Sequence, residues 1–261
     1  MNSPECVVHR LGLVPYQQAW ELQEALAQEI ALGQRPATLL LLEHPHTYTF
    51  GRRGQPENLL WDPAERACRG VEVLWVDRGG DVTYHGPGQL VGYPLLPLAA
   101  IQYDPDPNQD HSRLPQADYI GYLRKLESTL ILALMHLGVA SGQVQGLTGV
   151  WVQPEALSSC RNCRPEMRQR PAKLAAIGVK VDARGVSRHG FALNVDPDMD
   201  YWEGITGCGL QDYPNVSLAD LLPAIPSQEQ VADAIVAAFG EVFSYQMVEK
   251  TFNRGKNENQ Q

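Results

Sequence analysis

Residues 173–195 read KLAAIGVKVDARGVSRHGFALNV, and the two apolar runs in this stretch decide the fold class. Leu174–Val181 and Phe191–Val195 are short and apolar, which predicts two strands. Working outward, four earlier runs of the same kind also predict strands. They are Thr38–Leu42, Val71–Val76, Leu90–Leu95 and Gly149–Val152. Most glycine-containing motifs of the chain therefore fall on or beside strands.

Three longer segments have the periodicity and the end signals of helices. Tyr16–Leu32 repeats apolar residues at helical spacing and stops at Gly33, a natural C-terminal cap. Asp118–Leu137 also stops before a glycine, and a third helix begins at Ser227, where Gln230 completes a capping box. Helices and strands do not alternate regularly enough for a doubly wound parallel sheet. The sequence therefore favours an α+β fold, a mixed β-sheet flanked by helices.

Length and composition indicate one domain without membrane spans. The chain has 261 residues, of which 44% are hydrophobic, enough for a sizeable core. We expect a single domain over residues 1–252 and a disordered polar tail over 253–261. No apolar run approaches the ~20 residues of a transmembrane helix, and the N-terminus lacks a secretory pattern, so a cytoplasmic location is expected. The net charge of −9 excludes the broadly basic surface with which proteins bind nucleic acid.

Five cysteines without an export signal favour reduced thiols over a disulfide framework. Cys160 and Cys163 form a CxxC pair within Pro154–Ala172, a polar stretch that is predicted as a surface loop, like Gln102–Gln116. A CxxC pair is half of a structural zinc site or a redox pair, but zinc needs about four ligands and no second CxxC exists. A plain loop, a metal ligand pair and a redox pair stay open. We expect no bound metal and no cofactor.

Cys208 stands between Gly207 and Gly209 and is the candidate nucleophile. A cysteine between glycines has little side-chain cover, so a substrate carbonyl could approach the sulfur and backbone N–H groups could face it. A thiol with an ordinary pKa of about 8.5 is mostly protonated near neutral pH and needs a nearby cation, base or helix N-terminus. The alternative is a turn cysteine without a chemical role.

Lys173 is the candidate activator of that thiol. An ammonium in a partly apolar pocket would stabilise the thiolate and then donate a proton to a departing group, and residues 175–177 would supply such a pocket. Lys180 competes with it, but an odd spacing of seven residues would point it to the opposite face of a regular strand. The alternative is that Lys173 merely begins a strand at the surface.

The stretch RGGDVTYHGPG, residues 78–88, has the features of a pocket lip. Gly79 and Gly80 permit close backbone approach, and the Gly-Pro-Gly sequence at 86–88 forces a tight bend that aims His85 out of the preceding strand. The alternative is an ordinary hairpin with an arginine at its edge. His85 and His189 are also candidate bases in a Cys-His pair, as rivals to Lys173.

Taken together, seven blocks of this sequence resemble, in order, those of the octanoyltransferases, also called lipoyl(octanoyl) transferases, which catalyse the first step of lipoate synthesis. The similarity runs from about Leu39 to Leu210, and the 17-residue block 78–94 is too long for a chance match. The blocks are Glu43–Pro45, Thr49–Arg52, Arg78–Pro94, Thr148–Val152, Lys173–Gly178, His189–Asn194 and Cys208–Gly209. The resemblance implies the single-domain fold of biotin and lipoate protein ligases, a mixed sheet packed by helices.

The resemblance also implies roles for individual residues. Cys208 would attack the thioester of octanoyl-acyl carrier protein and carry the octanoyl group as a thioester, and Lys173 would lower the thiol pKa and shuttle protons. One departure is Gly207, where the family commonly has proline, so the rigidity of this turn depends on its surroundings. The positions that match the family's substrate-binding segments are Arg78, Gly79, Gly80, Asp81, Val82, Thr83, Tyr84, His85, Ala176, Ile177, Gly178, Gly190, Phe191 and Ala192.

The implied partners are octanoyl-acyl carrier protein as donor and, as acceptors, the lipoyl domains of 2-oxoacid dehydrogenases and the glycine cleavage H protein. Neither nucleic acid nor a membrane is expected as a partner, and a monomer is expected. Carrier proteins and lipoyl domains are acidic as families, so an acidic enzyme would repel them unless basic residues gather at the site mouth. Arg52, Arg53 and Arg78 could form that patch. The alternative is a solvated turn.

Two other functions are compatible with parts of the sequence. An ATP-dependent lipoate or biotin ligase would share the fold and need no thiol, but Gly51–Gly54 lacks the spacing and the Lys-Ser/Thr pair of a phosphate loop. A non-catalytic metal or scaffold protein centred on the CxxC pair would bind zinc. A covalent acyl adduct on Cys208, formed without ATP, distinguishes the transferase from both.

Overall fold

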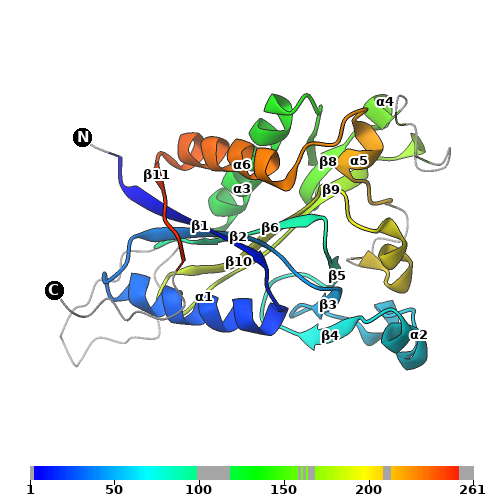
Figure 1. Cartoon of the computed structure of the whole chain (residues 1–261), viewed down its shortest axis with the longest axis horizontal. Helices are drawn as coiled ribbons and strands as arrows, with labels where there is room; N and C mark the ends of the chain where they lie inside the picture. The colour runs from blue at the N-terminus through cyan, green and yellow to red at the C-terminus, as the bar shows by residue number, and fades with distance from the viewer. Residues whose placement is uncertain are drawn as a thin grey trace.

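The computed structural model describes residues 3–98, 118–157, 160, 163, 168–207 and 213–252. Its main element is an eight-stranded sheet with the strand order β11-β1-β2-β6-β10-β9-β8-β7 (Figure 1). β1 runs parallel to β11 and β2, and the other pairs are antiparallel, so the predicted mixed sheet is confirmed. The strands are β1 (Glu5–Leu13), β2 (Ala37–Glu43), β6 (Gln89–Leu95), β7 (Gly142–Val144), β8 (Leu147–Val152), β9 (Ala172–Val181), β10 (Ser187–Asn194) and β11 (Gln246–Glu249).

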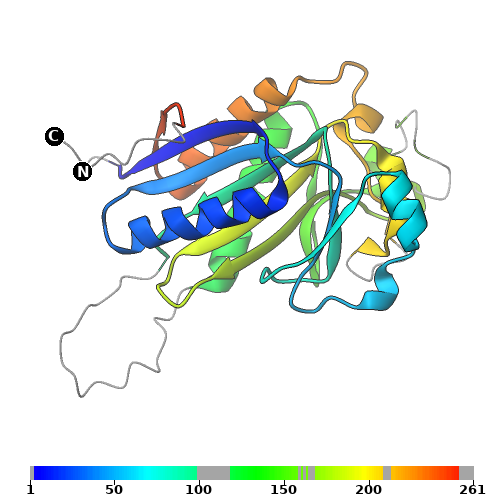
Figure 2. The same ribbon diagram turned by 60° about the horizontal axis from the view of Figure 1, so that its bottom comes forward.

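Helices cover both faces of this sheet (Figures 1 and 2). α3 (Tyr119–His136) and α6 (Gln228–Phe243) pack side by side on one face, and their apolar residues share a core with Leu39 and Leu41 of β2. α1 (Tyr16–Ala31) lies on the other face against β6 and β10. α1 and α3 were predicted within one residue of these bounds, and α6 begins directly after Ser227, which caps it with the predicted capping box.

A second, three-stranded sheet lies at one end of the molecule, with the order β4-β3-β5 (Figure 1). Val82 and Tyr84 of β5 pack into its core with Tyr48 and Phe50, so strand alternation turns Thr83 and His85 the other way. The remaining elements are β3 (Thr47–Phe50), β4 (Glu72–Trp75), β5 (Val82–His85), the short helices η1 (Pro56–Asn58), α2 (Pro63–Cys68), α4 (Pro154–Leu157) and α5 (Leu218–Leu221), and η3 (Met199–Gly204).

β9 carries a β-bulge at Leu174 and Ala175. Both residues pack into the α3/α6 core, although neighbours on a regular strand point to opposite faces. The register with β8 shifts at the same place. Val150 pairs with Ala175 and Trp151 with Lys173, so one residue of β8 corresponds to two residues of β9. The extra residue puts Lys173 and Ala176 on the same face of the sheet even though they are three positions apart.

The bulge corrects one prediction about the two lysines of β9. Ala176 pairs with Ala192, which belongs to the core under α1, and Lys180 is four residues farther along the same strand. Lys180 therefore shares the α1 face with Lys173, and the prediction of opposite faces is wrong. The prediction from the odd spacing failed because it assumed that side chains alternate without interruption along the whole strand, and the bulge interrupts this alternation.

The CxxC pair also differs from expectation. Cys160 and Cys163 form a disulfide, so the expectation of reduced thiols is wrong for this pair. Both residues are buried in the α3/α6 core, and Arg168 donates to the backbone oxygens of both. Of the predicted loop 154–172, the first four residues form α4 and Ala172 begins β9.

Several expectations lie outside the described residues. They are the loop Gln102–Gln116, the tail 253–261 and the position of Cys208 itself. Within the described ranges, no helix is long and apolar enough to span a membrane, and no group of three or more His, Cys, Asp or Glu residues is arranged to hold a metal ion.

Candidate active site

A pocket on the α1 face of the large sheet gathers most of the predicted substrate-binding residues. Its volume is about 40 Å³, enough for about three water molecules. β9 and β10 supply its floor, and β5, β6, α1 and the 78–80 turn supply its walls. The described residues that line it are Tyr16, Arg78, Gly79, Gly80, Thr83, His85, Tyr93, Ala176, Ile177, Gly178, His189, Gly190, Phe191 and Ala192.

Two glycines on facing positions of β9 and β10 make room for this pocket. Gly178 pairs with Gly190 in the sheet register. A Cβ on Gly178 would lie 3.0 Å from the backbone oxygen of Gly79, and one on Gly190 would collide with the backbone oxygen of Gly92. Gly178 therefore lets the 78–80 turn approach the sheet closely, and Gly190 leaves room for β6 beside β10.

Arg78 lines the pocket but is only 6% exposed, so it does not belong to a surface patch. Its guanidinium donates to the backbone oxygen and the hydroxyl of Thr49 and to the backbone oxygen of Gly79. Of the three arginines in the predicted basic patch, only Arg52 and Arg53 therefore lie at the surface. Both are exposed in a turn whose N–H groups donate to the backbone oxygens of Arg78 and Gly80.

Three of the predicted binding residues do not line the pocket. Val82 and Tyr84 face the core of the small sheet, where the Tyr84 hydroxyl hydrogen-bonds to His46 Nδ1 at 2.9 Å. The Asp81 carboxylate accepts from the backbone N–H groups of Gln55 (2.9 Å) and Val82 (2.7 Å). These residues shape the turn and the strand from which Arg78, Thr83 and His85 reach the pocket.

His85 presents a hydrogen-bond acceptor to the pocket. Gln89 donates its amide to the backbone oxygen of Tyr84 and to Asn194 Oδ1, which leaves Gln89 Oε1 to accept from His85 Nδ1 (2.8 Å). Burial, followed by the nearby His44 and Arg78, lowers the pKa of His85 well below 6.5. The ring is therefore neutral at pH 7, with its proton on Nδ1 and a lone pair on Nε2.

His189 is held in the opposite tautomer at the pocket wall. Its Nε2 donates to Asp77 Oδ1 (2.6 Å), and the Tyr16 hydroxyl lies 3.3 Å from Nδ1, where it can only donate to a neutral ring. Burial lowers the pKa of His189, although Asp77 opposes this shift. Its backbone φ of 56° is unusual outside glycine and is fixed by an N–H donated to Gln23. Both ring nitrogens are thus occupied, which argues against His189 as a free base.

The sequence analysis did not identify Tyr16, Tyr93 or Asp77 as site residues. Tyr16 and Tyr93 line the pocket, and Asp77 holds His189, Lys180 and Arg188 together behind it. Tyr93 did stand within the recognised block 78–94. Tyr16 and Asp77 gave no signal, because their contacts with His189, more than a hundred positions away, form only in the folded protein.

Lys173 is buried at the start of β9, on the pocket side of the sheet. Only 7% of it is exposed, and its Nζ lies 4.7 Å from the centre of the Trp151 ring. Among the residues that the structure describes, no carboxylate forms an ion pair with this amine. The predicted apolar surroundings of Lys173 are present, and an aromatic ring supplies them. The face of that ring attracts the ammonium without neutralising its charge, so the charge stays available to a thiolate.

Two described segments flank residues 208–212, which include Cys208. On their N-terminal side, a Cβ on Gly207 would lie 3.9 Å from Asn215 Nδ2, and Asn215 forms an isolated β-bridge with Lys173. On their C-terminal side, the Tyr213 ring lies 5.4 Å from that of Trp151. Gly207 and Tyr213, the described residues on either side, therefore lie close to residues that contact Lys173.

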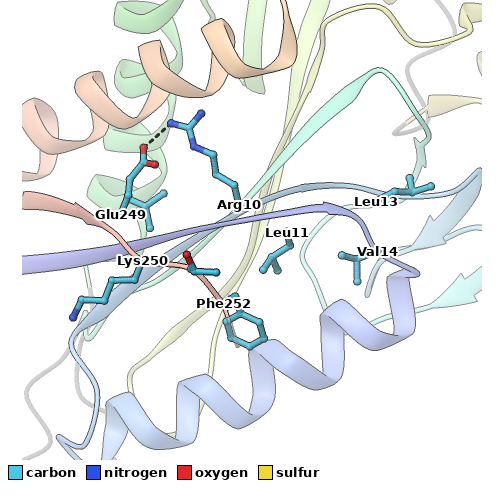
Figure 3. A pocket seen from close by; sticks show the side chains of 9 residues that line it. Arg10, Leu11, Leu13, Val14, Glu249, Lys250 and Phe252 are labelled. Carbon is cyan, nitrogen blue, oxygen red and sulfur yellow. Dashed lines mark hydrogen bonds and ion pairs between the residues drawn. The ribbon is translucent and has the colours of Figure 1, made fainter. Parts of the chain in front are cut away.

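A second depression is unrelated to these residues. It has a volume of about 580 Å³ and lies between β1, the end of β11 and residues 250–252 (Figure 3). Its one arginine, Arg10, is paired with Asp233 (2.5 Å) and Glu249 (2.6 Å). Although it is larger than the motif-lined pocket, it contains none of the predicted site residues, so we place the active site at the smaller pocket.

Comparisons with known proteins identify the family of this chain. The chain matches the lipoyl protein ligase A/B catalytic domain over residues 15–240. It is 44% identical over 237 residues to an octanoyltransferase of Chloroflexus aurantiacus, covering 91% of this chain and 93% of that protein. An octanoyltransferase of Gloeobacter violaceus is 42% identical over 242 residues, covering 92% of this chain and 91% of the relative.

A solved structure confirms the predicted fold type. A bi-partite lipoate protein ligase from Thermoplasma acidophilum superposes with a TM-score of 0.65 at 15% identity, covering 97% of this chain and 89% of that chain. At such low identity the likeness concerns the fold alone, whereas the two relatives above share over 40% of their residues along nearly their whole length. This chain belongs to the octanoyltransferase family.

Proposed function

We propose that this protein transfers an octanoyl group from octanoyl-acyl carrier protein to a lysine amine of lipoyl domains, through a thioester on Cys208. The observation that supports the proposal is that Gly207 and Tyr213, the described residues on either side of 208–212, lie close to residues that contact Lys173. Cys208 is the residue after Gly207, so its Cα is about 3.8 Å from a position already close to Asn215. The bulge in β9 turns Lys173 toward the same face as the pocket.

The first half-reaction needs a thiolate and a proton donor. The Lys173 ammonium stabilises the Cys208 thiolate, which attacks the thioester carbonyl of the donor. The tetrahedral intermediate collapses by breaking the bond to the carrier's thiol, and that departing sulfur takes a proton from Lys173. The products are free carrier thiol and an octanoyl thioester on Cys208.

The second half-reaction reverses these roles. The neutral amine of the acceptor lysine attacks the enzyme thioester and loses one proton to the now neutral Lys173 amine, and the Cys208 thiolate leaves. The octanoyl group ends as an amide, and the ammonium–thiolate pair is restored. No ATP is needed, because the thioester already carries an activated acyl group.

The acyl chain would occupy the pocket next to Ala176, Gly178 and Ala192. The present volume of about 40 Å³ is smaller than an eight-carbon chain requires, so binding must widen it. The 78–80 turn covers this part of β9, where Gly79 N–H donates to the backbone oxygen of Val179 (3.0 Å).

Arg52 and Arg53 form the docking surface that we propose for the acidic donor protein. Both are exposed beside the pocket lip, and within the described ranges neither is paired with a carboxylate. Substituting both with glutamate should raise the KM for octanoyl-acyl carrier protein about tenfold or more and leave the rate for a small octanoyl thioester unchanged. An unchanged KM for the carrier substrate would exclude this surface.

The proposed function is tested by intact-protein mass spectrometry after incubation with octanoyl-acyl carrier protein and no ATP. The expected result is one added octanoyl group, mapped to Cys208 and absent from Cys208→Ala. Cys68→Ala is the matched control, because Cys68 is an exposed free cysteine that does not line the pocket. Octanoyl transfer to a lipoyl domain that persists in Cys208→Ala, or that requires ATP, would favour a ligase instead.

A further inference from the structure

Trp151 of β8 lies directly opposite Lys173 of β9 in the sheet register. Its sequence neighbours Val150 and Val152 both pack into the α3/α6 core, so the Trp151 ring points to the other face of the sheet, the one that carries the pocket. The side chain is fully buried. Trp151 and Lys173 therefore stand side by side on the α1 face.

Backbone contacts place the Cα of Lys173 but do not fix its amine. The N–H of Lys173 donates to the oxygen of Pro214 (2.8 Å), and its carbonyl accepts from the N–H of Val216 (3.0 Å). The Nζ ends a flexible stem of four carbons that can adopt many rotamers. Within the described ranges, no hydrogen bond or ion pair holds this Nζ, whereas it lies 4.7 Å from the centre of the Trp151 ring. The indole face is therefore the described contact that locates the amine.

The same ring offsets the cost of burying a charge. Lys173 is 7% exposed, and burial of an ammonium away from water favours the neutral amine. The face of an indole attracts a cation more strongly than the ring of phenylalanine or tyrosine does, and the attraction is largest where water is excluded. Trp151 thus favours the charged form of the amine at a place where no described carboxylate does.

The surroundings of Trp151 leave its ring free for this contact. Its register partner on β7 is Gly142, which has no side chain to compete for the ring. The Tyr213 ring lies 5.4 Å away and nearly perpendicular, at 71°. Among the residues that the structure describes, Trp151 belongs to no apolar cluster, and its Nε1 has no hydrogen-bond partner. The contact with the lysine therefore explains a tryptophan here better than core packing or an indole hydrogen bond does.

We propose that Trp151 is a positioning residue for the reaction, which holds the Lys173 ammonium charged and at a fixed place through the face of its ring. This inference rests on the proposed function, because Lys173 is the group that activates the thiol and donates the proton there. Without the ring, the amine is free to adopt other rotamers and to lose its charge, so fewer molecules present the ammonium where the reaction needs it. Trp151 thus acts through Lys173 and not by contact with the substrate.

A double-mutant cycle tests whether Trp151 acts through Lys173. The measured quantity is the rate of octanoyl loading of the full chain from a small octanoyl thioester, at a temperature where thermal melts show each variant to be folded. Trp151→Leu should slow loading about tenfold, and Trp151→Phe, which keeps an aromatic face, about threefold, with the KM unchanged in both. In the Lys173→Met background, neither substitution should slow loading further. Trp151→Phe keeps the test decisive if Trp151→Leu does not fold.

Phe243→Leu is the matched control. The Nζ of Lys125 lies 5.4 Å from the centre of the Phe243 ring, so this substitution removes a second contact between a lysine and an aromatic face. Phe243 packs against the α3/α6 core, on the opposite face of the sheet from Lys173. Its substitution should leave the loading rate unchanged.

Folded Trp151 variants that load at the wild-type rate would overturn the inference. So would losses that multiply with the loss in Lys173→Met, or an equal loss in Phe243→Leu. These outcomes are distinguishable from a failure of the proposed function. If Lys173→Met slows loading while the Trp151 variants act independently of it, only the positioning role is wrong. If no octanoyl adduct forms on Cys208 in the wild type, the proposed function itself is wrong.

Discussion

The two ends of β9 each place a lysine on the α1 face of the sheet, in opposite surroundings. At one end, Lys173 lies over the Trp151 ring, and no described carboxylate pairs with it. At the other end, Lys180 is ion-paired with Asp77, which also binds Arg188 and His189. A carboxylate neutralises the charge that a thiolate would need, whereas an aromatic face leaves it available. The comparison indicates that Lys173 is the chemical lysine and Lys180 the structural one.

The largest expected effect separates these two lysines directly. Lys173→Met should slow formation of the octanoyl adduct on Cys208 by about 100-fold to 1,000-fold, because both the thiolate and the proton donor are impaired. Lys180→Met should leave that rate within about threefold. Rapid-quench mass spectrometry measures both rates, and comparable losses in the two variants would remove the distinction.

The next effect concerns the Asp77 cluster. Asp77→Asn should lower the free energy of unfolding at pH 7 by about 3 kcal/mol, because Arg188, which is only 5% exposed in its side chain, loses a charged partner. Glu24 still pairs with Arg188 at 2.8 Å, so the protein should remain folded. Urea unfolding measures the difference, and Glu24→Gln, which removes only the more exposed partner, is the control.

The pH dependence of that difference has a defined sign. Burial raises the pKa of Asp77, but its hydrogen bonds to His189 and Lys180 and the nearby cations outweigh burial and hold the pKa well below 3.8. A depressed pKa contributes stability above the unfolded-state value and loses it as pH falls toward the folded-state value. The gap between wild type and Asp77→Asn should therefore shrink below about pH 4. A gap that widens there would contradict the ion-pair account.

A smaller effect comes from His189 in the same cluster. Its lowered pKa means that the unfolded chain binds a proton more readily than the folded one, so its contribution is full above pH 6.5 and is lost as pH falls below that value. His189→Asn, chosen because asparagine tolerates the positive φ, should flatten the fall in stability between pH 6.5 and 5. Denaturant melts at these two pH values measure it, and an unchanged slope would assign the titration elsewhere.

The smallest effect is expected at the Lys173 end, at Gly207. A Cβ there would lie 3.1 Å from the Trp202 ring, so an added methyl needs that ring to yield by a few tenths of an ångström. Gly207→Ala should cost less than about 1 kcal/mol and change the loading rate less than threefold. Contact with Trp202 thus limits the freedom that the glycine gives this turn. A loss of loading as large as that of Lys173→Met would mean that the turn itself aligns the thiol.

Much of the fold was predictable because periodicity and end signals are local. The six expected strands and three expected helices are present, and Ser227 caps α6 as predicted. β1 was missed because its residues lie before the first helix and do not alternate, and β3 was missed because Thr47 and Thr49 look solvent-facing in sequence. Both threonines are fully buried, where their backbones pair in the small sheet.

The site was predictable only where its residues stand in recognisable blocks. The resemblance led to Arg78, His85 and Gly178, and the structure brings these together in one pocket. It could not reveal the bulge at Leu174, because a bulge depends on the register of the partner strand. Nor could it place Tyr16 or Asp77, since tertiary contacts alone bring them to the pocket and to His189.

The account depends most on the claim that Lys173, and not Lys180, ionises the Cys208 thiol. The direct measurement is the thiol pKa of Cys208, from alkylation rates across pH, in wild type, Lys173→Met and Lys180→Met. The account predicts a wild-type value clearly below 8.5, a rise toward 8.5 in Lys173→Met and no change in Lys180→Met. An equal thiol pKa in wild type and Lys173→Met would contradict it.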